Sequence, residues 1–184
     1  ALADTVAEVV RALGLGAVDV FGHELGAAVA LALATRAPAL VERITLIEPP
    51  LAGLDPARIT PAIEPGRDGQ HLLAAWGFAR DERLCAPWYE TGVGGLIRRD
   101  VDLDPASLHV RVVELLKCGH DRLAAAHAAM LARPLAPVGK PVTLAVTQSH
   151  PQAAAWAAEA MRLGAGFVTV PSAMARWAEA AAPL

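Results

Sequence analysis

The hydrophobic pattern along the chain alternates between strand-like runs and amphipathic helical segments. Apolar runs rich in β-branched residues predict strands at residues 18–22, 41–47, 142–146 and 166–170. Helical spacing is found at residues 4–13, 27–36, 151–163 and 172–182. In the first helix, four apolar side chains share one face that we expect to be buried: Val6, Val9, Val10 and Leu13. Alternating helices and strands predict an α/β protein with a parallel sheet.

The strand pattern is absent from residues 51–137. Helical segments are predicted there at residues 69–84, 88–98, 105–117 and 120–132. We therefore expect an α/β core formed by residues 1–50 and 138–184, with residues 51–137 as a helical insertion. Trp76, Trp88 and Tyr89 lie in this insertion. They either line an apolar pocket or form the core of the insertion itself.

Composition and charge exclude several classes of partner. The 184 residues are 54% hydrophobic, which is enough for a substantial core. A formal net charge of −3 without basic runs gives no footprint for nucleic acid or an anionic membrane. No stretch reaches the roughly 20 apolar residues of a membrane helix. We expect a soluble protein with neither partner.

The two cysteines and the first residue bear on the compartment. Cys85 and Cys118 lack a paired spacing and are typical of ordinary thiols in a reducing compartment, although a disulfide stays open. The chain begins with alanine, and no secretory signal follows. These features predict a cytoplasmic protein, and we expect the sequence to start within a longer one.

One turn carries the candidate chemistry. The predicted strand 18–22 ends in Gly22-His23-Glu24-Leu25-Gly26, and a helical segment follows. Two glycines flank Glu24, as expected where a tight strand–turn–helix leaves no room for a Cβ on either side. The segment resembles the nucleophile elbow of α/β hydrolases, Gly-x-Ser-x-Gly, with Glu24 at the serine position. We expect Glu24 to have a positive φ, at a cost of roughly 1–3 kcal/mol.

The order of elements also resembles the C-terminal two-thirds of an α/β hydrolase. The resemblance implies a parallel sheet with a helical cap insertion, without the N-terminal strands of the family. It implies a nucleophile position at Glu24, an N–H of the oxyanion hole at Leu25 and an elbow histidine at His23. The usual acid position after residues 142–146 holds no carboxylate, but some members place the acid where this chain has Glu48. Glu24 and Glu48 are expected to lie near one another.

Two functions follow from this resemblance. In the first, a hydrolase-like protein acts on a small apolar substrate, with Glu24 as nucleophile or general base and Glu48 as its partner. In the second, the protein is a catalytically inactive binding or scaffold protein. The Ser-His-Asp triad is absent because no histidine follows the last predicted strand, so enzymatic activity is left open. His150 is a further catalytic candidate because it lies on the turn after residues 142–146.

The predicted ligand-binding residues are His23, Leu25, Trp76, Trp88 and Tyr89. No cofactor is predicted, and no metal site either, because the histidines of the insertion lie at no metal-ligand spacing. These histidines are His71, His109, His120 and His127.

The expected sheet leaves residues 18–22 at an edge. This strand is almost continuously apolar, apart from Asp19, and a bare apolar edge invites pairing with another chain. We expect strands preceding Ala1 in a longer protein, or a second copy of the chain, to cover it.

Overall fold

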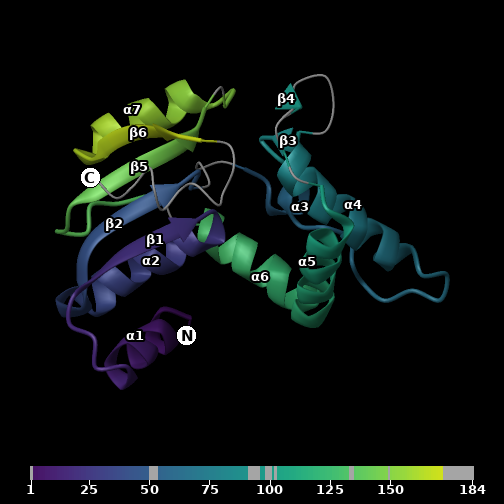
Figure 1. The fold of residues 1–184 in the computed structure, drawn as a ribbon, viewed down its shortest axis with the longest axis horizontal. Coiled ribbons are helices and arrows are strands. Elements are labelled where there is room, and N and C mark those ends of the chain that lie inside the picture. Colours follow the sequence, from purple (N-terminus) through teal and green to yellow (C-terminus); the bar gives the residue numbers. More distant parts are fainter. Residues whose placement is uncertain are drawn as a thin grey trace. The chain divides into compact units, whose positions relative to one another are not determined.

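The computed structural model describes residues 2–49, 54–90, 96–97, 101, 103–132, 135–148 and 150–171. The chain divides into two compact units (Figure 1). The α/β unit contains Ala1–Ala52, Arg133–Ser149 and Ala153–Leu184, and the helical unit contains Gly53–Ala132 with His150–Gln152.

The α/β unit is built on a four-stranded parallel sheet with the order β1-β2-β5-β6. The strands are β1 (Val18–His23), β2 (Val41–Ile47), β5 (Val142–Thr147) and β6 (Gly166–Val170). All four predicted strands are confirmed, and β1 is an edge strand of the described sheet, as expected. The helices of this unit are α1 (Leu2–Ala12), α2 (Leu25–Arg36) and α7 (Ala153–Leu163), with a 3₁₀ turn at Pro38–Leu40. The predicted helix at residues 172–182 lies outside the described residues.

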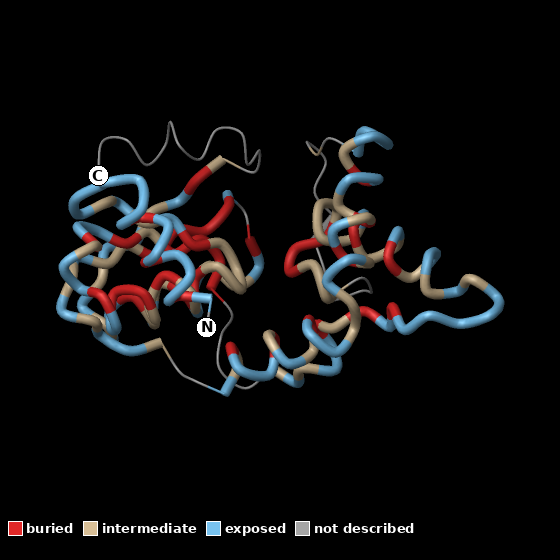
Figure 2. Tube along the Cα trace, turned by 90° about the horizontal axis from the view of Figure 1, so that it is seen from below, coloured by how far each residue is buried: buried red, intermediate tan, exposed pale blue. Residues whose placement is uncertain are grey.

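The main core of this unit lies on one face of the sheet. Alternate residues of β2 and β5 point into it, as the period of two in a strand requires. Helices α2 and α7 contribute to the same cluster, and Figure 2 shows the buried residues in red. Its largest fully buried side chains include Leu33, Ile44, Leu46, Leu144 and Val146. A smaller cluster is formed by Ile47, Ala145 and Val170, which occupy the alternate positions of their strands.

Helix α1 buries a different face from the one predicted. Its buried residues are Ala3, Ala7 and Val10, whereas Val6, Val9 and Leu13 are exposed. The prediction was therefore wrong for three of its four residues. The physical reason is that α1 packs against α2 through small alanine side chains, which allow the two helices to approach closely.

The helical unit contains α3 (Pro56–Ile59), α4 (Gln70–Leu84), α5 (Pro105–Cys118) and α6 (His120–Leu131). Its core joins residues from α4, α5, α6 and the segment before α4: Ile63, Ala75, Ala79, Leu108, Val112, Leu115 and Leu123. The predicted helices at 69–84, 105–117 and 120–132 are confirmed. None of the described helices is long and apolar enough to cross a membrane.

The helix predicted at residues 88–98 is wrong at residues 88–90 and 96–97, and its remaining residues lie outside the described part of the chain. β3 (Cys85–Ala86) pairs antiparallel with β4 (Leu96–Ile97), and residues 88–90 are not helical. The N–H of Glu90 instead donates to the carbonyl of Pro87 at 2.9 Å, which closes a tight turn.

Candidate functional site

The turn between β1 and α2 holds Glu24 in a strained backbone conformation. Glu24 precedes α2 with φ 47° and ψ −113°, so the expected positive φ is observed. A Cβ on Gly22 would lie 2.6 Å from the carbonyl oxygen of Gly26 and 2.7 Å from the Cα of Ala27. Only glycine therefore allows this close approach of strand and helix. At Gly26 a Cβ would meet nothing within 4 Å, so the expectation of a second crowded glycine is wrong.

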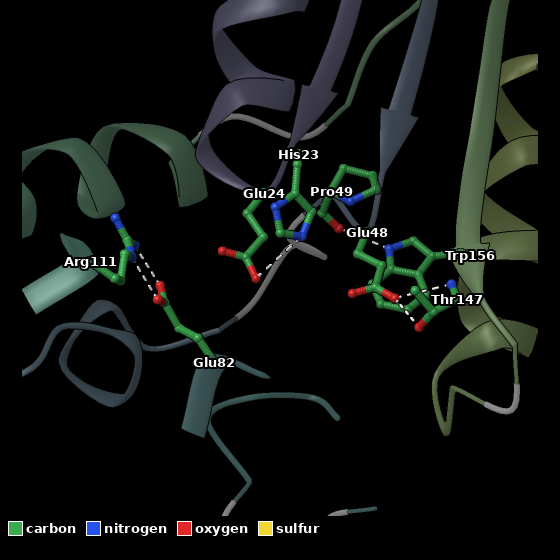
Figure 3. A network of polar contacts seen from close by, with 8 residues as sticks. All are labelled: His23, Glu24, Glu48, Pro49, Glu82, Arg111, Thr147 and Trp156. Carbon is green, nitrogen blue, oxygen red and sulfur yellow. Dashed lines mark hydrogen bonds and ion pairs between the residues drawn. The ribbon is translucent and has the colours of Figure 1, made fainter. Parts of the chain in front are cut away.

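Glu24 lies at the positive end of α2. The first N–H groups of a helix have no partner within the helix, and their partial charge favours an anion. Leu25 is the first residue of α2 and places its N–H in this group. The Glu24 side chain is partly exposed, and its Oε1 lies 3.7 Å from Nε2 of His23 (Figure 3). The elbow thus presents a carboxylate beside an imidazole and a helix N-terminus.

Glu48 occupies the end of the neighbouring strand β2. Only 8% of its surface is exposed, and its φ of 45° is also positive. Its Oε1 accepts hydrogen bonds from the backbone N–H of Thr147, at 3.0 Å, and from the Thr147 hydroxyl. The next residue, Pro49, accepts a hydrogen bond of 2.8 Å from the indole N–H of Trp156 (Figure 3). Side chains of β5 and α7 therefore fix the end of β2.

The backbones of the two glutamates lie close together, as expected. His23 pairs with Ile47, and the N–H of Glu24 donates to the carbonyl of Ile47 at 3.2 Å. Their carboxylates, however, point toward different partners: that of Glu24 toward His23 and that of Glu48 toward Thr147 (Figure 3). The sequence did not identify Thr147 and Trp156 as site residues. The only signal that it offers for them is their position, Thr147 at the end of a predicted strand and Trp156 on a predicted helix.

The aromatic candidates form contacts within the helical unit. The Trp88 ring packs edge-on against Phe78, with centroids 4.8 Å apart, and against Tyr89 at 5.5 Å. The amide nitrogen of Gln152 donates to the Tyr89 hydroxyl at 3.0 Å. Trp76 on α4 is 38% exposed and offers an apolar surface. A role for these three aromatic residues in ligand binding stays a prediction.

His150 is buried and belongs to the helical unit. Its Nδ1 accepts a hydrogen bond of 3.1 Å from the backbone N–H of Gln152. Because Nδ1 is an acceptor in this bond, the ring proton of the neutral imidazole is on Nε2. The histidine thus stabilises its own turn, and a catalytic role for it stays a prediction.

Two polar pairs connect helices of the helical unit. The Arg111 guanidinium on α5 donates two hydrogen bonds, of 2.7 and 2.6 Å, to the Glu82 carboxylate on α4 (Figure 3). The buried His127 on α6 has its Nδ1 2.9 Å from the hydroxyl of Thr60, the residue that ends α3. Burial lowers the pKa of His127, and the charge of Arg111 lowers it further.

Comparison with solved structures establishes the fold. A hydrolase from Pseudomonas aeruginosa PA01 shares 20% identity, with a TM-score of 0.59, over 97% of this chain and 66% of its own. An α/β hydrolase fold protein from Burkholderia ambifaria shares 16% identity, with a TM-score of 0.60, over 99% of this chain and 70% of its own. A carboxylesterase structure from the thaumarchaeon Nitrososphaera gargenis shares 15% identity, with a TM-score of 0.56, over 94% of this chain and 62% of its own.

No protein-family model matches the sequence, and no curated protein matches it either. The chain spans 62% of the length of the Nitrososphaera structure, so it corresponds to part of that protein. The parallel sheet, the strand–turn–helix at Glu24 and these structural neighbours together show that the chain has the α/β-hydrolase fold.

Proposed function

We propose that this chain is a hydrolase-like protein that acts on a small apolar substrate through the carboxylate of Glu24. The observation that carries this proposal is the strained conformation of Glu24 directly before α2. A residue held at such a cost at the start of a helix is typical of a functional site. A carboxylate is ionised at neutral pH, so it can act as a nucleophile without a base to deprotonate it.

A small haloalkane illustrates the substrate class. One oxygen of Glu24 attacks the carbon that carries the halogen, the new C–O bond forms as the C–halogen bond breaks, and halide leaves with the electron pair. The product is a glutamyl ester. Water then attacks the ester carbonyl and gives up a proton, and the bond between the carbonyl carbon and the alkyl oxygen breaks. The leaving oxygen takes up one proton to become the alcohol, the other proton of water passes to solvent, and the Glu24 carboxylate is regenerated.

The residues around Glu24 have supporting roles in this proposal. His23 is assigned as the group that accepts a proton from the attacking water, since its Nε2 lies 3.7 Å from the Glu24 carboxylate. The N–H of Leu25 is assigned to the oxyanion formed on the ester. Glu48 is a positioning residue, because its bonds to Thr147 hold the end of β2 to β5, and the carbonyl of Ile47 at that end accepts from the N–H of Glu24.

The second candidate is a catalytically inactive binding or scaffold protein. It is favoured by the buried carboxylate of Glu48, which accepts two hydrogen bonds from Thr147 and so has a structural use. In this alternative, His23 and Leu25 contact a small apolar ligand without covalent chemistry. Separately, Trp76, Trp88 and Tyr89 are proposed as apolar ligand contacts of the helical unit.

Covalent trapping distinguishes the two functions. The chain is incubated with 1,2-dibromoethane, bromide release is measured, and the intact mass is recorded. We expect bromide release and an alkylated species whose modified residue is Glu24. Glu24→Gln, which keeps the shape but removes the charge, should lose both signals. Glu42→Gln, at an exposed glutamate of β2, is the matched control and should retain them.

A negative result has a defined meaning. If the wild-type chain binds the haloalkane saturably by NMR but shows neither bromide release nor a Glu24 adduct, the nucleophile proposal is rejected. The binding protein then becomes the better description. Adduct formation that persists in Glu24→Gln would place the reactive group elsewhere.

A further inference from the structure

We propose that Glu64, His120 and Asp121 form a binding site for a divalent metal ion of the zinc type in the helical unit. Each residue offers one ligand atom, and these atoms all lie within 4.8 Å of one another. Glu64 comes from the segment between α3 and α4, whereas His120 and Asp121 begin α6. The site is separate from Glu24 and does not rest on the proposed function.

The tautomer of His120 favours metal binding. Its Nδ1 lies 3.1 Å from the carbonyl oxygen of Pro61, and a carbonyl can only accept a hydrogen bond. Nδ1 therefore carries the proton, and Nε2 of the neutral ring has a lone pair. An imidazole that donates one ring N–H to a backbone carbonyl while its other nitrogen binds the ion is typical of metal-ligating histidines.

The charges around Nε2 complement a cation. Nε2 of His120 lies 3.4 Å from Oε1 of Glu64. The lone pair of this nitrogen and the negative carboxylate repel one another unless a proton or a cation lies between them. Asp121 adds a second carboxylate to the same cluster. The N-terminus of α6 carries a partial positive charge that opposes a cation, so both carboxylates are needed.

The donor set is suited to zinc. One imidazole nitrogen and two carboxylate oxygens are ligands that Zn²⁺ accepts, and three protein ligands leave one tetrahedral position for water. Glu64 and Asp121 are exposed, which allows an ion to enter from solvent.

The backbone around the three residues is anchored in the core of the helical unit. Ile63, next to Glu64, is 2% exposed, and its N–H donates to the same Pro61 carbonyl that accepts from His120. Leu123, in the first turn of α6, belongs to the same core cluster. The two segments that supply the ligands are thus held together before an ion binds.

Calorimetric titration of the tag-free chain with Zn²⁺ alone tests the site. The titration is made in a Cys118→Ser background, because Cys118 is an exposed free thiol two residues before His120 and could bind zinc itself. We expect one ion per chain. His120→Gln, Glu64→Gln and Asp121→Asn should each lower the affinity at least about tenfold. His109→Gln and Glu114→Gln, at exposed positions of α5, are the matched controls and should leave it unchanged.

Two results would overturn the proposal. One is a folded chain, checked by circular dichroism, that takes up no ion at about 1 mM Zn²⁺. The other is zinc binding that His120→Gln leaves unchanged. Either would mean that His120 and Glu64 do not form a metal site. Co²⁺ provides an independent readout, because its visible absorption should indicate a tetrahedral site with one nitrogen ligand, lost in His120→Gln.

Discussion

At the turn between β1 and α2, two glycines four residues apart have opposite steric requirements. Alanine at position 22 would place its Cβ 2.6 Å from the backbone of Gly26, so we expect Gly22→Ala to lower the free energy of unfolding by about 1–3 kcal/mol. Alanine at position 26 meets nothing, and it favours the helix, so Gly26→Ala should raise that free energy by about 0.5–1 kcal/mol. Urea unfolding of both variants measures this difference. Equal effects of the same sign would contradict the geometry of the elbow.

The strain at Glu24 is also measurable. Glycine adopts a positive φ without penalty, so Glu24→Gly should raise the free energy of unfolding by about 1 kcal/mol, after allowing for the entropy cost of glycine. Glu48→Gly provides the contrast. It also relieves a positive φ but removes the buried carboxylate that accepts from the N–H and hydroxyl of Thr147, so it should be destabilising. A destabilised Glu24→Gly would show that the elbow is not strained.

At the scale of elements, prediction succeeded where a long segment has one dominant pattern. The apolar runs of β2 and β5 are buried on both sides of the sheet, so they are recognisable without knowing their partners. β3 and β4 have two residues each and α3 has four, too few for a periodic pattern. The buried face of α1 depended on its contact with α2, which no local pattern reveals. The elbow was predicted from five residues, but the partners of Glu48 come from β5, far along the chain.

The contact between α6 and α3 makes stability dependent on pH. The Thr60 hydroxyl donates to the Pro56 carbonyl, so Nδ1 of His127 supplies the proton of the bond between them. The folded pKa of His127 is lowered from its ordinary value of 6.5, mainly by burial and also by Arg111. Its contribution to stability is therefore fully present above pH 6.5, and it is lost as the pH falls from there toward the folded pKa, because the unfolded chain takes up the proton first.

Unfolding by urea between pH 5 and 8 tests this dependence. His127→Gln keeps a donor for Thr60 but cannot titrate in this range, so it should reduce the loss of stability below pH 6.5. His109→Gln, which removes an exposed histidine of α5, should keep the wild-type slope. If the free energy of unfolding depends on pH in the same way in all three proteins, His127 does not control that dependence.

At the scale of the whole molecule, the edge of the sheet is the main expected site of association. Phe21 on β1 is 52% exposed, and the charge of Asp19 on the same strand is paired with the Arg43 guanidinium at 2.7 Å. The edge therefore has little protection against pairing with another strand. We expect a second copy of the chain to cover it.

Sedimentation velocity of this polypeptide over a range of concentrations tests the expectation. The wild-type chain should self-associate, and Phe21→Lys should shift it toward monomer because a lysine on an edge strand opposes pairing. Met161→Lys, at an exposed apolar residue of α7, is the matched control. A soluble wild-type monomer at every concentration would remove the need for a partner at β1.

The pairing of β2 with β5 has a consequence for the order of folding. Most of the helical unit is synthesised after β2 and before β5, so a ribosome-bound chain has only β1 and β2 available for the sheet at that stage. Two strands are marginally stable alone. The helices can form through local contacts in the meantime, and a folded insertion shortens the flexible loop that must close when Val142 reaches Ile44. Because loop-closure entropy changes slowly with length, substituting a flexible linker for the helices would cost the sheet little stability.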